Sequence, residues 1–205
     1  ARLAATAAIM KVAPTMPFVV TSYVTEALGY FAGSYGVPRV LIAHPLSAEG
    51  GKLAGCAAAL GYETDVATTG RQAYELAISS PDYDLALFHA AIGRPAVDEL
   101  VAQFRRDRRT ANLPIGLLAP LENTDRVESF ARRAGGLKVM LQPQNEAEMK
   151  LLVSDILVLA GRSHVSVEIR RQQALAAIEW LVALPQSPGH FFDWRQLGAQ
   201  IIPLI

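Results

Sequence analysis

Two histidines each follow a short apolar run, at the point where a buried strand would end. His44 comes directly after RVLIA (residues 39–43), and His89 comes directly after DLALF (residues 84–88). Neighbouring parallel strands end at the same edge of a sheet, so both imidazoles are expected to reach one crevice. Imidazoles at that edge could bind a metal ion, accept a phosphoryl group or pack against each other.

A metal site would need more ligands than these two histidines. Zn²⁺ and Cu²⁺ accept imidazole, but a third ligand is required, and only Glu49 stands nearby in the sequence. We therefore favour an interpretation in which the histidines fill the crevice and hydrogen-bond to loops or to each other, and we predict no cofactor. Sensing of a metal or small ligand through His44 and His89 is the alternative.

The sequence around these runs alternates between strand and helix patterns. Further strands are predicted at residues 62–68, 114–119 and 137–143. Helices are predicted after each strand, at residues 47–60, 70–79, 95–106, 122–134 and 145–160. Short loops between alternating elements predict an α/β fold, a doubly wound five-stranded parallel sheet. The more polar second strand favours a sheet edge and hence the flavodoxin-like order 2-1-3-4-5.

The two ends of the chain have a different pattern. We expect residues 1–37 and residues 163–205 to be helical segments on either side of an α/β domain at residues 38–162. Short helices separated by prolines resemble HEAT-like helical repeats. The missing initiator Met and the apolar ending IIPLI favour a fragment of a larger protein.

Composition argues against several classes of protein. The 205 residues include 19 Lys and Arg and 19 Asp and Glu, and a net charge of zero does not favour nucleic-acid or anionic-membrane binding. No run of about eighteen uncharged apolar residues predicts a membrane span. The single cysteine, Cys56, excludes an internal disulfide and suits a reducing, cytoplasmic location. We find no nucleophile paired with a base in the sequence, and we therefore do not predict an enzyme.

Residues 38–162 resemble the receiver domain of response regulators. The most specific blocks are TTGRQAYEL after the second strand, SPDYDLALF leading into the third and RRTANLPIGLLA leading into the fourth. The closing LQP stands where receiver domains usually carry Lys-Pro. The resemblance implies the same sheet, a place in bacterial signal transduction and partners that are proteins.

The expected phosphorylation site departs from the pattern of that family. Receiver domains phosphorylate an aspartate after the third strand, hold Mg²⁺ through an acidic pair after the first, and bind the phosphoryl oxygens through Thr or Ser and Lys. The matching positions here are His44, Pro45, His89, Ala119 and Gln142. Since this set provides no strand-end carboxylate for Mg²⁺, the resemblance implies a degenerate receiver, or pseudo-receiver, that takes no phosphate.

The helix predicted at residues 145–160 is apolar on more than the face that covers the sheet. Leu151, Val158 and Leu159 point away from that face. We predict that they form an interface, either with the flanking helices or with the same helix of a second subunit, and the tethered flanks are favoured. The sequence thus predicts a phosphorylation-independent module for protein–protein interaction or regulation.

Overall fold

In the computed structural model, which describes residues 2–12, 16, 18–19, 21–161 and 165–183, the chain divides into two units. The α/β unit comprises residues 37–78 and 82–165. The helical unit comprises residues 1–36, 79–81 and 166–205.

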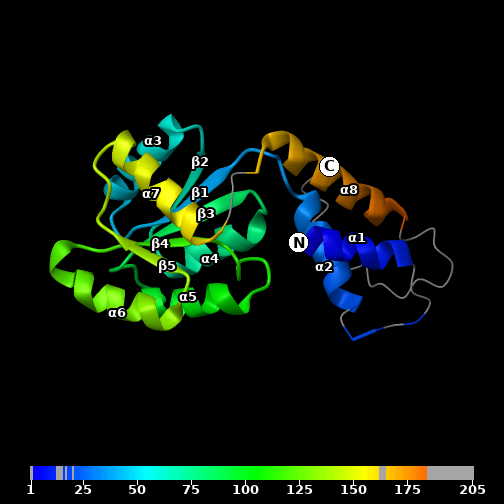
Figure 1. The fold of residues 1–205 in the computed structure, drawn as a ribbon, viewed down its shortest axis with the longest axis horizontal. Helices are drawn as coiled ribbons and strands as arrows, with labels where there is room; N and C mark the ends of the chain where they lie inside the picture. Colours follow the sequence, from blue (N-terminus) through cyan, green and yellow to red (C-terminus); the bar gives the residue numbers. More distant parts are fainter. Residues whose placement is uncertain (1, 13–15, 17, 20, 162–164, 184–205) are drawn as a thin grey trace. The chain divides into compact units, whose positions relative to one another are not determined.

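Among the described residues, five strands form one parallel sheet in the order β2-β1-β3-β4-β5 (Figure 1). The strands are β1 (Arg39–Ala43), β2 (Glu63–Ala67), β3 (Tyr83–His89), β4 (Ile115–Leu118) and β5 (Leu137–Met140). The three inner strands are almost wholly buried, whereas β2 is exposed or half-buried over most of its length, as suits an edge strand. The predicted fold and strand order are confirmed.

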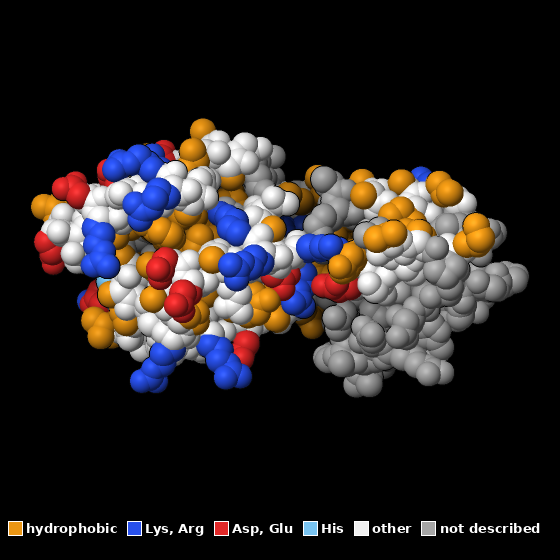
Figure 2. All heavy atoms as spheres, turned by 90° about the horizontal axis from the view of Figure 1, so that it is seen from below, with side chains coloured by type: hydrophobic (Ala, Val, Ile, Leu, Met, Phe, Trp, Pro, Cys, Tyr) orange, Lys and Arg blue, Asp and Glu red, His pale blue; other side chains and the backbone are white. Residues whose placement is uncertain are grey.

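Helices cover both faces of the sheet, as the alternation predicted (Figure 1). One face is covered by α3 (Ser47–Ala59) and α7 (Glu146–Leu159), and the other by α4 (Gly70–Ser79), α5 (Val97–Arg106) and α6 (Thr124–Ala134). Alternate residues of β3 serve the two cores, since Leu85 and Leu87 pack with α3 and α7 while Ala86 and Phe88 pack with the other helices. The outward faces of α5 and α6 carry charged side chains of both signs (Figure 2).

The helical unit contains α1 (Arg2–Val12), α2 (Thr21–Ala32) and α8 (Val167–Ala183). The hydrophobic core of this unit includes the buried residues Val24, Leu28, Ala32 and Ala177. The likeness of these flanks to HEAT-like repeats stays a prediction, and residues 184–205 lie outside the described residues. Among the described helices, none combines the length and the apolar character needed to cross a lipid bilayer.

Candidate functional site

His44 and His89 lie against each other at the carboxyl ends of β1 and β3. Their ring centroids are 4.4 Å apart, and the ring planes are inclined by 56°. Strand pairing causes this contact, because Ala43 and Phe88 are partners in the β1–β3 register and the histidines are the next residue in each strand. The structure therefore brings together the two histidines that sequence analysis singled out.

His44 is held by the backbone that follows it. Its side chain is buried, and Nδ1 lies 3.1 Å from the amide nitrogen and 3.0 Å from the carbonyl oxygen of Leu46. The ring is thus hydrogen-bonded to the chain two residues later in either tautomer. Its own amide donates to the carbonyl of Ala67 at 2.9 Å, which fixes the end of β1 beside β2.

His89 is half-buried and accepts a hydrogen bond. Nδ1 takes the backbone N–H of Ala91 at 3.1 Å, so the proton of the neutral ring lies on Nε2. Burial lowers the pKa of His89 below its ordinary value, and the neighbouring His44 lowers it further because two imidazolium charges would repel each other. The ring at the end of β3 is therefore neutral near pH 7.

The remaining predicted pocket residues contribute little charge. Pro45 is exposed, and Ala119 is buried and donates its amide to the carbonyl of Met140 at 3.0 Å. Gln142 donates from Nε2 to Oε2 of Glu49 at 3.1 Å. The structure thus links Gln142 to a residue of the first turn of α3.

The carboxylate of Glu49 is already engaged. Its Oε1 accepts from Nζ of Lys52 at 2.7 Å, and its Oε2 accepts from Gln142. The hydrogen bond from Lys52 is the main cause that lowers the pKa of Glu49. Within the described ranges, no three His, Cys, Asp or Glu side chains are grouped as metal ligands.

The loop after His89 is fixed to the beginning of α4, a feature that sequence analysis missed. The amides of Gly70 and Arg71 donate to the carbonyls of Gly93 and Arg94 at 2.8 and 2.7 Å. A Cβ at Gly70 would lie 2.7 Å from the carbonyl oxygen of Pro95, so the close approach requires glycine. The glycine that opens the helix in TTGRQAYEL was the available signal.

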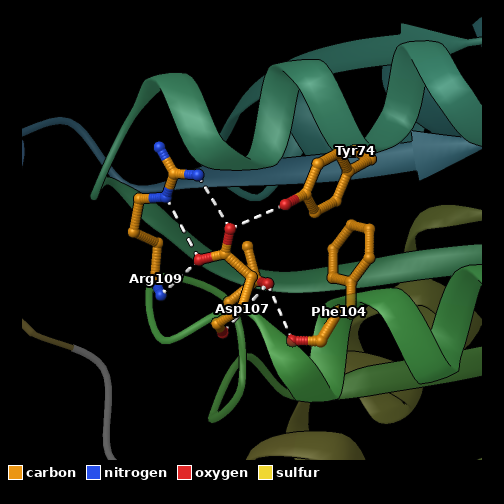
Figure 3. A network of polar contacts seen from close by, with 5 residues as sticks. Tyr74, Phe104, Asp107 and Arg109 are labelled. Atoms are coloured by element: carbon orange, nitrogen blue, oxygen red, sulfur yellow. Dashed lines mark hydrogen bonds and ion pairs between the residues drawn. The ribbon is translucent and has the colours of Figure 1, made fainter.

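A second polar network lies between α4 and the loop before β4 (Figure 3). Asp107 accepts from the hydroxyl of Tyr74 at 2.7 Å and from the guanidinium and amide of Arg109 at 2.7 to 3.1 Å. Burial would raise the pKa of Asp107, but the hydrogen bonds from Arg109 and Tyr74 outweigh it and lower the pKa to about 2. Burial, with the Asp107 hydrogen bond, raises the pKa of Tyr74. This network fastens helices and offers no free acid or base.

Solved structures with the same architecture include response regulators and a receiver domain of a histidine kinase. The chemotaxis response regulator CheY4 of Vibrio cholerae aligns with a TM-score of 0.53 and 18% identity, over 59% of this chain and 99% of that chain. A putative response regulator from Chloroflexus aurantiacus gives 0.53 and 20%, over 60% and 98%. The receiver domain of a signal transduction histidine kinase from Syntrophus aciditrophicus gives 0.52 and 18%, over 62% and 96%. This chain has the receiver-domain fold. No protein-family model and no curated protein sequence matches it.

The predicted resemblance to receiver domains is thus confirmed for the fold. The last helix of this receiver fold is α7, which buries Met149, Leu152, Val153 and Ile156 against the sheet. Leu151, Val158 and Leu159 remain 68%, 75% and 53% exposed. The three residues predicted as an interface therefore lie on the surface of α7, away from the core of the receiver fold.

Proposed function

We propose that this chain is a pseudo-receiver, a receiver-like module that regulates by contact with proteins and without phosphorylation. One observation carries the proposal. The end of β3, where a receiver presents its phosphoryl acceptor, holds the neutral ring of His89 packed at 4.4 Å on the ring of His44. A neutral imidazole engaged through Nδ1 with Ala91 is a poor replacement for a carboxylate nucleophile.

The residues of the pocket do not fit Mg²⁺. This ion demands octahedral oxygen ligands, and the ends of β1 and β3 offer two imidazoles and Pro45. Glu49 is the carboxylate of this region, and both of its oxygens are used by Lys52 and Gln142. A receiver pocket without its metal site lacks the charge that stabilises the transferring phosphoryl group.

The two remaining phosphate contacts of a receiver are also replaced. Ala119 has no hydroxyl that could donate to a phosphoryl oxygen, and Gln142 has no positive charge. Since acceptor, metal ligands, hydroxyl and cation are all changed, we assign no catalytic residue to the chain. We place its action in the cytoplasm, where the free thiol of Cys56 would stay reduced.

The exposed side of α7 is the surface through which we propose that the module acts. This side of the helix carries three apolar side chains that are each more than half exposed, Leu151, Val158 and Leu159. Apolar side chains grouped in this way on a surface are typical of an interaction site. Covering two of these side chains would stabilise a contact by about 2–4 kcal/mol. The partner is either the chain's own helical flanks, which tethering favours, or the same helix of a second copy.

The test is a titration of the full chain with Mg²⁺ and beryllofluoride, followed by NMR, with incubation in acetyl phosphate followed by intact-mass measurement. We expect neither chemical-shift changes at His44 and His89 nor an added phosphoryl mass. A stoichiometric phosphoryl adduct, or saturable beryllofluoride shifts at the end of β3, would overturn the proposal.

A further inference from the structure

A groove lies between α5 and α6, beside the carboxyl ends of β3 and β4. Its volume is about 340 Å³, and its walls include Ala90, Val97, Val127 and Phe130. Sites for small molecules have volumes of roughly 300–1,000 Å³, so this groove suits a ligand at the small end of that range. It is separate from the two histidines, since neither of them lines it.

Two arginines of α6 also line this groove. Arg126 and Arg133 are seven residues apart, which places them two helical turns apart on one side of α6. Neither forms an ion pair with any residue that the structure describes, and Arg133 makes a hydrogen bond to the hydroxyl of Ser129 at 2.9 Å. By contrast Arg132, which does not line the groove, is paired with Glu128 at 3.4 Å.

The opposite wall carries one acidic group. Asp98 lies in the first turn of α5, where the helix dipole stabilises a negative charge. Two arginines against one aspartate give the groove a net charge of +1. A single added negative charge would balance it.

We propose that this groove binds a small organic acid, in which one carboxylate is attached to an apolar ring. The guanidinium of arginine presents planar, paired donors that match a carboxylate, and Arg126 and Arg133 have no carboxylate partner within the described chain. The ring would lie on Phe130 and Val127. The balance of charge favours a monoanionic carboxylate over a dianionic phosphate.

The groove adjoins the loop that follows the histidine pair at the ends of β1 and β3. Ala91 lines the groove, and its amide is the group that donates to Nδ1 of His89. A ligand in the groove would therefore contact the same loop that holds the histidine. Binding in the groove does not depend on whether the chain takes phosphate.

The test is an NMR titration of the full chain with phenylacetate, with neutral phenylacetamide as the matched probe. We expect saturable shifts at the amides of Ala90, Val97 and Phe130, with a Kd on the order of 1–10 mM for so small a ligand. Phenylacetamide should bind about fivefold more weakly, because it lacks the charge. Inorganic phosphate, which lacks the ring, should bind more weakly as well.

Variants assign the binding to the groove. Arg126→Gln and Arg133→Gln should each weaken phenylacetate about threefold or more, whereas Arg132→Gln should leave the Kd unchanged. Ala96→Phe, which places a ring in the groove at an exposed position, should abolish the shifts while the remaining spectrum stays the same. Absence of saturation at 50 mM phenylacetate, equal affinity for the amide, or equal weakening by Arg132→Gln would each overturn the proposal.

Discussion

Nδ1 of His89 lies 3.1 Å from the backbone nitrogen of Ala91 and accepts its hydrogen. A protonated imidazole carries hydrogen on both nitrogens and cannot accept this bond. Protonation would also place a charge in a half-buried position beside His44. Three separate effects thus keep the ring neutral in the folded chain.

Stability should therefore depend on the protonation of His89. The folded pKa lies below the ordinary value of 6.5, so the unfolded chain binds the proton first as the pH falls. We expect the free energy of unfolding to be unaffected by this group above about pH 6.5 and to decline below it. Urea unfolding between about pH 5 and 8 measures the decline.

His89→Asn is the matched variant for this measurement. Its amide oxygen can accept the hydrogen of Ala91, and it does not titrate. We expect a smaller decline in its free energy of unfolding below pH 6.5 than in the unaltered chain. Identical pH profiles for the two proteins would assign the dependence to other groups.

Changing the acceptor position alone should not restore phosphorylation. In His89→Asp, His44, Pro45, Ala119 and Gln142 would still leave Mg²⁺ and the phosphoryl oxygens without ligands. We expect no phosphoryl adduct by intact-mass measurement after incubation with acetyl phosphate and Mg²⁺. The control variant restores the acceptor, the Mg²⁺ ligands, the hydroxyl and the cation together. It combines His89→Asp with His44→Asp, Pro45→Asp, Ala119→Thr and Gln142→Lys. An adduct in the single variant would show that the unaltered residues already support the transfer.

The network around Asp107 should stabilise the fold at neutral pH. Asp107→Asn removes a charge that four hydrogen bonds from Tyr74 and Arg109 stabilise, and we expect a loss of about 1–2 kcal/mol in the free energy of unfolding. Because the folded pKa is about 2 and the ordinary value 3.8, this contribution is present above about pH 4 and is lost as the pH falls through 2. Tyr74→Phe, which removes one of the donors, should lose roughly half as much.

The packing of α7 on β4 depends on the absence of a side chain at Gly116. An added Cβ would lie 2.5 Å from Cδ1 of Ile156 and 3.0 Å from Cδ2 of Leu87, and both of these side chains are buried in the core. We expect Gly116→Val to lower the free energy of unfolding by about 1–3 kcal/mol. Gly55→Ala is the control, since an added Cβ there meets no atom within 4 Å and alanine favours the helix by about 0.5–1 kcal/mol.

The exposed side of α7 is tested by placing charge on it. Leu151→Glu with Val158→Glu should lower the melting temperature if the flanks cover α7, or dissociate a dimer if a second copy does. Light scattering after size exclusion, together with thermal unfolding, separates the two partners. A double variant that keeps both its mass and its melting temperature would place the interface elsewhere.

The sheet could be predicted because its signals are local. The apolar runs of β1, β3 and β4 mark buried strands, and the polar residues of β2 mark an edge, which favoured the order that the sheet has. The contact of His44 with His89 followed as well, since both end adjacent strands.

Contacts between distant loops could not be predicted in the same way. The helix that was predicted from residue 95 begins at Val97. The carbonyls of Gly93 and Arg94 in the preceding loop accept hydrogen bonds from the first amides of α4, so they are not used within α5. The bond from Tyr74 to Asp107 joins residues 33 positions apart and depends on how two helices pack. Such bonds are set by three-dimensional packing, and neither periodicity nor residue type indicates them.

Hydrogen bonds connect the end of β3, the loop that follows it and the first turn of α4 in one continuous series. His89 is bonded to Ala91, and the carbonyls of Gly93 and Arg94 are bonded to the amides of Gly70 and Arg71. We expect a displacement of the imidazole, by a proton or by a partner, to reach the first turn of α4 through these hydrogen bonds, which would make the position of that helix sensitive to the state of His89.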